Sequence, residues 1–69
     1  MRYAIVVERA ENGFSAYAPD LPGCVAAGDS YDETVDLMRE AIEFHVEGMR
    51  MNGEPVPMPT TAAEYVDVA

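Results

Sequence analysis

In the first part of the chain, the odd-numbered and the even-numbered positions are both mainly apolar. Over residues 2–9, the odd positions include Tyr3, Ile5 and Val7, and the even positions include Ala4 and Val6. A period of two is typical of a β-strand, and a strand that is apolar on both faces is typical of the middle of a sheet. The pattern therefore predicts a central strand over Arg2–Arg9.

A hairpin and a rigid corner are predicted next. Ala10-Glu11-Asn12-Gly13 reads as a tight turn, with Asn12-Gly13 supplying the positive φ. Residues 14–18 return as an antiparallel strand. Leu21-Pro22-Gly23-Cys24 then has a type II turn signature, because proline presets φ and glycine accepts a positive φ.

The corner also has a predicted role in recognition. We expect Asp20, Leu21 and Pro22 to form a rigid, exposed tip, which loses little entropy when a partner docks. A third strand of small residues, Cys24–Ala27, is predicted to follow the corner and to end at Gly28.

A long helix is predicted from Tyr31 to about Met51. Ser30 and Glu33 form a capping box at its start, and Asn52-Gly53 followed by Pro55 stops it. One arc of this helix is polar; its members are Asp32, Glu33, Asp36, Arg39, Glu40, Glu43, Glu47 and Arg50. The remaining apolar arc is wider than one sheet face needs, which leaves Leu37, Phe44 and Gly48 as an oligomer or partner surface.

The last part of the chain is predicted to cross the molecule and add a strand. Residues 54–59 alternate proline and must be extended, and Tyr65–Val68 reads as a final strand. We expect residues 1–69 to form a single α+β domain of β-β-β-α-β order. Its small antiparallel or mixed sheet carries the one long helix on one face.

The net charge of the chain indicates which class of molecule it binds. The 69 residues carry 13 acidic and 4 basic side chains, for a net charge of −9. This balance disfavours direct binding of nucleic acid and favours a basic protein partner; acidity that only aids solubility is the alternative. One cysteine, no signal peptide and no apolar run of membrane-spanning length lead us to expect a cytoplasmic protein without a membrane anchor.

No residue pattern favours catalysis. His45 lies on the apolar arc of the predicted helix without an evident orienting carboxylate. Cys24 has only apolar or acidic neighbours, which do not activate a thiol. The carboxylates near the helix start lack the spacing of a calcium loop. We expect no catalytic residue, no metal and no cofactor.

Four stretches together resemble the HicB family of antitoxins: Pro19–Cys24, Gly28-Asp29-Ser30, the acidic helix, and Gly53-Glu54-Pro55-Val56-Pro57. The resemblance covers nearly the whole chain. It implies a fold similar to a truncated ribonuclease H, without that fold's chemistry. It also implies a partner, a small basic HicA-type toxin that cuts mRNA with a catalytic histidine, whose site the antitoxin covers.

Charge and geometry, and not the resemblance, suggest the contact residues. Asp36, Glu40, Glu43 and Glu47 would pair with the basic surface of a toxin. Leu37, Phe44 and the tip formed by Asp20, Leu21 and Pro22 would supply apolar anchors.

Two further expectations concern function. Many HicB antitoxins carry a DNA-binding domain at the C-terminus, and none is expected in residues 1–69. The alternative function is a structural or regulatory homo-oligomer of the same fold, a dimer or tetramer with no toxin partner.

Overall fold

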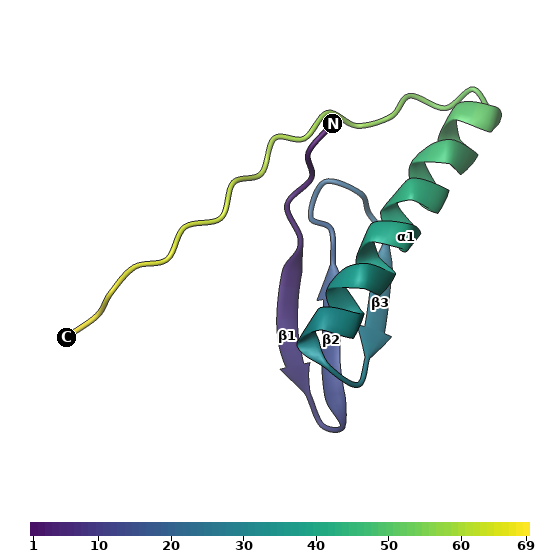
Figure 1. The fold of residues 1–69 in the computed structure, drawn as a ribbon. Helices are drawn as coiled ribbons and strands as arrows, with labels where there is room; N and C mark the ends of the chain where they lie inside the picture. The colour runs from purple at the N-terminus through teal and green to yellow at the C-terminus, as the bar shows by residue number, and fades with distance from the viewer.

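The computed structural model describes residues 1–69 as a three-stranded antiparallel sheet with one helix on one face (Figure 1). The strands are β1 (Val6–Ala10), β2 (Gly13–Tyr17) and β3 (Val25–Gly28), and the helix is α1 (Tyr31–Met51). The predicted α+β class, the antiparallel sheet and the long helix are confirmed. α1 is not apolar enough to cross a membrane.

The β1–β2 hairpin closes where the sequence places its turn. Ala10 is opposite Gly13, and the register continues to Val6 opposite Tyr17. Gly13 is required here because a Cβ at this position would collide with the carbonyl oxygen of Gly28 at the end of β3. The hairpin turn and the last residue of the sheet are therefore in direct contact.

Two successive tight turns build the corner between β2 and β3. The Leu21 N–H donates to the Ala18 carbonyl at 3.0 Å, and the Cys24 N–H donates to the Leu21 carbonyl at 3.0 Å. Gly23 has a φ of 83°, as the predicted type II signature requires. The corner is thus hydrogen-bonded within itself.

Leu21 does not lie on an exposed tip, so that prediction is wrong. Its side chain is only 1% exposed and joins the core with Met38 and Cys24. The double turn folds the corner back on itself, and the largest apolar side chain of the corner is buried because that removes it from water. Pro22, the next residue, stays exposed.

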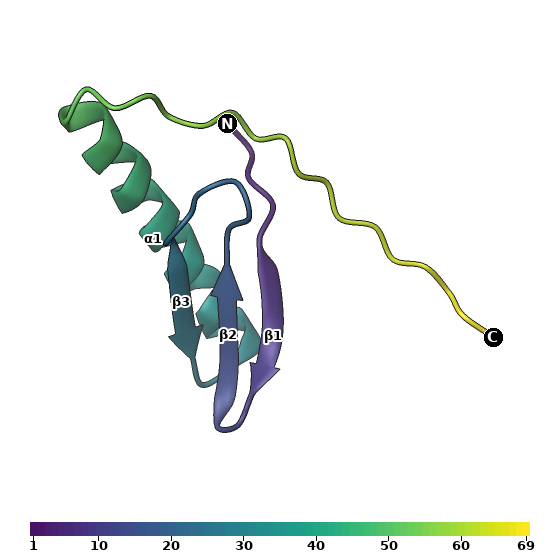
Figure 2. The ribbon, with the colours of Figure 1, turned by 180° about the vertical axis from the view of Figure 1, so that it is seen from behind.

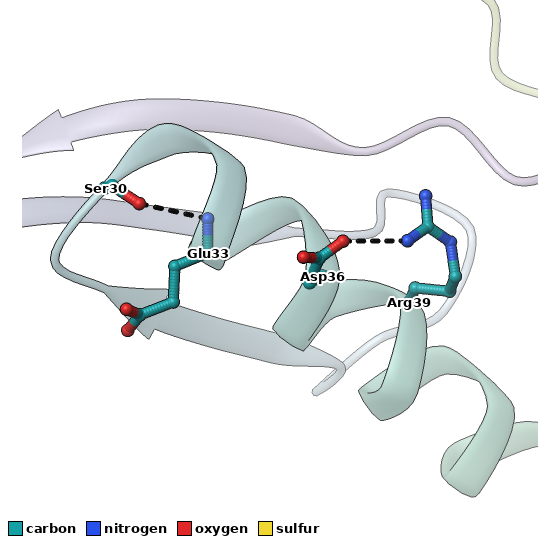
Figure 3. Close-up of polar contacts among 4 residues, drawn as sticks. All are labelled: Ser30, Glu33, Asp36 and Arg39. Atoms are coloured by element: carbon teal, nitrogen blue, oxygen red, sulfur yellow. Dashed lines mark hydrogen bonds and ion pairs between the residues drawn. The ribbon is translucent and has the colours of Figure 1, made fainter.

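Both ends of α1 are capped by local hydrogen bonds. At the start, the Ser30 hydroxyl accepts from the Glu33 N–H at 3.1 Å (Figure 3), and the Glu33 carboxylate accepts from the Asp29 N–H at 3.3 Å. At the end, Glu54 N–H donates to the Met49 carbonyl at 2.8 Å, and Gly53 has a φ of 69°. This is a Schellman motif, so the predicted helix bounds are confirmed.

The core lies between α1 and the sheet. α1 packs chiefly on β3 and β2 and touches β1 least. Its buried side chains are Thr34, Met38 and Val46. Met38 and Val46 pack in one cluster with small residues of the sheet such as Ala16. No helix covers the opposite face of the sheet (Figure 2), where Val6, Tyr17 and Val25 form one cross-strand row.

Two strand predictions are wrong. The first strand is Val6–Ala10 at an edge of the sheet and not a central strand over Arg2–Arg9. Tyr65–Val68 forms no strand; residues 54–69 contain no helix or strand, and residues 60–69 are exposed. Figure 1 shows this segment passing the N-terminus and then leaving the sheet.

The path of the C-terminal segment has a physical cause. Prolines keep residues 55–59 extended and remove backbone donors. The Tyr3 hydroxyl holds the segment by donating to the Pro57 carbonyl. The radius of gyration is 13.3 Å, above the ~11 Å typical of a compact chain of this length.

Truncating Leu21 tests the corner. We expect Leu21→Ala to lower the free energy of unfolding by about 2–5 kcal/mol, because it leaves a cavity in the core. Leu37→Ala, at an exposed leucine of α1, is the matched control and should cost under about 1 kcal/mol. Urea unfolding followed by circular dichroism measures both; equal costs would contradict the assignment of Leu21 to the core.

Candidate protein-binding surface

α1 presents a stripe of side chains away from the sheet. Steps of four and three residues keep a helical side chain on one face, and α1 carries acidic and apolar residues in strict alternation at this spacing. We call these residues the outward stripe: Glu33, Leu37, Glu40, Phe44, Glu47 and Met51. All of them are exposed.

The apolar members of the stripe have no partner in the chain. Phe44 is 82% exposed and Leu37 is 37% exposed. An aromatic side chain in that position offers a large apolar area to a partner. The predicted placement of Leu37 and Phe44 outside the core is therefore confirmed.

The negative charge beside the stripe is almost uncompensated. Asp36 accepts an ion-pair hydrogen bond from Arg39 at 2.9 Å, with both side chains exposed (Figure 3), and this is the one salt bridge in the chain. An exposed pair of this kind contributes little to stability. Glu40, Glu43 and Glu47 are exposed and have no cationic partner, so their field is free to act on another molecule.

The corner and the helix flank meet in one hollow. Pro22, Phe44 and Gly48 are among the residues that line a surface depression of about 640 Å³. Nothing lies within 4 Å of the position of a Cβ on Gly48. The structure thus joins Pro22 and Phe44, two residues that the sequence suggested separately, into a continuous surface.

Asp20 is engaged within the chain. Its carboxylate accepts hydrogen bonds from the backbone N–H groups of Thr60 and Thr61, both at 3.0 Å, and from their hydroxyls at 3.1 and 2.8 Å. The Thr61 N–H is the largest of the influences that lower the pKa of Asp20, because these donors stabilise the charged carboxylate. Asp20 therefore fastens the C-terminal segment to the corner.

Comparison with known proteins identifies the family. Residues 3–68 match the profile of the HicB-like antitoxin of bacterial toxin-antitoxin systems. The chain belongs to the HicB-like antitoxin family.

Individual relatives match over nearly the whole chain. A 14.9 kDa protein of Haemophilus phage HP1 is 37% identical over 97% of this chain and 50% of its own length. Antitoxin HicB 2 of Photorhabdus laumondii is 30% identical over 99% of this chain and 50% of its own length. The chain thus spans about half the length of these two relatives.

A solved structure agrees with the HicB-like fold. A chain in the HicA3 and HicB3 toxin-antitoxin complex superposes with a TM-score of 0.75 at 32% identity, covering 87% of this chain and 70% of that one. The similarity is therefore not confined to the sequence: the chain also shares its three-dimensional fold with a chain of that toxin-antitoxin complex.

Cys24 and His45, the two side chains weighed for chemistry, lie in different settings. Cys24 is a buried free thiol, and burial raises its pKa because the thiolate would lose its hydration. His45 is half-buried in the wall of the hollow beside Phe44. No three His, Cys, Asp or Glu side chains of the chain are grouped to hold a metal ion.

Two parts of this surface were missed in the sequence. Met51 and Glu33 extend the stripe by a turn at either end. Glu33 was placed on the polar arc but not among the contact residues, and the four-residue steps from Glu33 to Leu37 and from Glu47 to Met51 were a readable signal. The pairing of Asp20 with Thr60 and Thr61 spans 40 and 41 residues, and no local pattern indicates a contact of that separation.

The Asp20 contact should titrate in acid. The folded-state pKa of Asp20 lies below the ordinary value of 3.8, so its stabilising contribution is complete above pH 3.8 and is lost as the pH falls through the lower folded-state pKa. In a ¹H–¹⁵N NMR titration we expect the Thr60 and Thr61 amide signals to shift with a midpoint below 3.8.

Two variants check this assignment. Asp20→Asn should abolish the amide titration of Thr60 and Thr61, whereas Asp67→Asn, at an exposed carboxylate beyond the contact, should leave it intact. A midpoint above 3.8, or a titration that survives Asp20→Asn, would contradict the role of Asp20.

Proposed function

We propose that this chain is an antitoxin that binds a small basic HicA-type toxin and covers the surface with which the toxin binds and cuts RNA. The single observation that carries the proposal is the outward stripe of α1. It presents acidic and apolar side chains in alternation. All are exposed and none forms a salt bridge; Glu33 alone has a hydrogen-bond partner, the Asp29 N–H.

The stripe suits a surface that has evolved to hold RNA. Such a surface is cationic, because phosphate neutralisation dominates nucleic-acid affinity. Glu40 and Glu47 would take the place of phosphates, and they would steer the encounter before contact. Phe44 would supply the buried anchor that most interfaces need at their centre.

The family membership and the solved complex support the same assignment. Members of the family are antitoxins of bacterial toxin-antitoxin systems, and the structural match comes from a HicA3 and HicB3 complex. The proposal adds the identity of the partner class, the contact surface and the cytoplasm as the place of action. It assigns the protein no catalytic step and no cofactor.

Co-purification tests the proposal. The full chain, tagged at its N-terminus and expressed in its own host, should retain a small basic protein in stoichiometric amount and release it at high salt. The released protein should cut RNA, and adding back one equivalent of the chain should suppress the cleavage. RNA cleavage that continues unchanged at excess chain would overturn the proposal.

Charge reversal on the stripe locates the surface. We expect Glu40→Lys combined with Glu47→Lys to weaken toxin binding at least ~100-fold, because two attractive contacts become repulsive. Isothermal titration calorimetry at 0.15 M salt measures the change. The loss should come with little change in the thermal unfolding of the chain itself, since both side chains are exposed.

A control separates local contact from net charge. Glu11→Lys reverses an exposed carboxylate in the turn between β1 and β2 and should change the affinity less than about threefold. If Glu11→Lys weakens binding as much as the stripe variant does, the stripe is not the contact surface.

A further inference from the structure

β1 lies at the edge of the sheet, although residues 3–7 have the apolar pattern of a central strand. The strand order is β1-β2-β3, so β1 has a neighbour on one side only. Residues 3–7, which precede and begin the strand, are nevertheless mainly apolar and all half-buried, whereas Glu8 and Arg9 are charged and exposed. Proteins normally shorten, charge or cover an edge of this kind, because its unpaired backbone groups pair with other chains.

The C-terminal tail, residues 62–69, lacks a hydrogen-bonded neighbour as well. Tyr65, Val66 and Val68 are 98%, 80% and 88% exposed. No hydrogen bond of the chain involves residues 62–69. The last proline is Pro59, so every residue of the tail retains the N–H that a strand ladder needs.

The two features match in length and charge. Seven residues, 62–68, span about 23 Å as a strand, and the edge offered by residues 2–9 is of similar length. The tail carries Glu64 and Asp67, whereas the edge carries Arg2 and Arg9, neither of which has a carboxylate partner in the chain. Opposite charges on adjacent strands stabilise their pairing.

The tail is directed away from the β1 of its own chain. Asp20 fixes its root through Thr60 and Thr61, and residues 61–63 still pass beside residues 2–5. Beyond this point both views of the ribbon show the tail diverging from the sheet (Figures 1 and 2). A fixed root and an outward path favour a neighbour on another molecule.

We propose that residues 62–68 pair as a fourth strand with the outer edge of β1 in a second copy of this chain, and that the second copy returns the same exchange. Each copy carries both the tail and the edge. Two copies related by a two-fold axis therefore make both contacts, and the assembly closes as a dimer. Val66 and Val68 then lie beside the apolar residues that precede and form β1.

The exchange also accounts for the small core of the single chain. Only 7 of the 69 residues are buried, which is little for a domain that must be stable alone. Covering β1 from outside completes the burial of side chains such as Ile5 and Val7. The inference does not depend on toxin binding, and its tests use the purified chain alone.

Solution mass is the first test. We expect the full chain to have twice the 7.5 kDa chain mass in light scattering at micromolar concentration. Removing residues 62–69 should give a monomer, and so should Val66→Asp combined with Val68→Asp. The helical circular-dichroism signal should stay unchanged in both variants, because these residues lie outside α1.

Phe44→Asp is the matched control for the mass test. It places a charge on the other large exposed apolar surface, the outward stripe, and should leave the dimer intact. A full chain that is monomeric at all concentrations overturns the proposal. So does an oligomer that Phe44→Asp dissociates and the tail variants do not, since that oligomer forms through α1.

Isotope-filtered NMR distinguishes exchange from folding back. In a one-to-one mixture of ¹³C-labelled and unlabelled chains, filtered NOEs from Val66 or Val68 to residues 2–9 should connect different chains. If the same NOEs occur only within one chain, the tail covers its own β1 and the proposal is wrong. This readout needs no assumption about strand register and does not use a destabilising variant.

Discussion

The scarcity of buried surface is the constraint on which this structure depends. A single helix must cover a three-stranded sheet, and the fully buried large side chains are Leu21, Met38 and Thr34. Small residues in β2 and β3 let α1 come close, and the corner contributes Leu21 from outside the regular elements. This small core leaves the edge of β1 and the outer side of α1 uncovered.

The parts that the sequence predicts well are those decided within a few residues. The capping of α1 by Ser30 and its Schellman end at Gly53 each depend on hydrogen bonds across three to five positions. The turn at Gly23 likewise follows from the backbone freedom of one residue. Such interactions are encoded locally, so their residue types are sufficient to place them.

The parts that the sequence predicts poorly depend on distant or absent neighbours. Proline and glycine fix the backbone of the corner, but they do not decide whether Leu21 faces water or the core. The apolar pattern of residues 3–7 indicates that both faces of this segment are covered. It does not indicate which segment, or which chain, covers them. The contact of Asp20 with Thr60 and Thr61 could not be read at all, because it joins two polar segments far apart in the sequence.

The outward stripe of α1 and the free edge of β1 point in different directions, so a molecule bound at one surface need not block the other. Phe44 and Leu37 face away from the sheet, whereas the free edge of β1 lies in the plane of the sheet. Two chains of net charge −9 repel, and the proposed exchange through tail and edge would not require their acidic helix faces to meet. A pair built in this way would present two outward stripes at once, and two linked sites hold a multivalent basic partner more tightly than one site does. The proposed self-association would therefore be compatible with the proposed partner binding, because the exchange would use residues that α1 does not cover and would leave the outer face of α1 free.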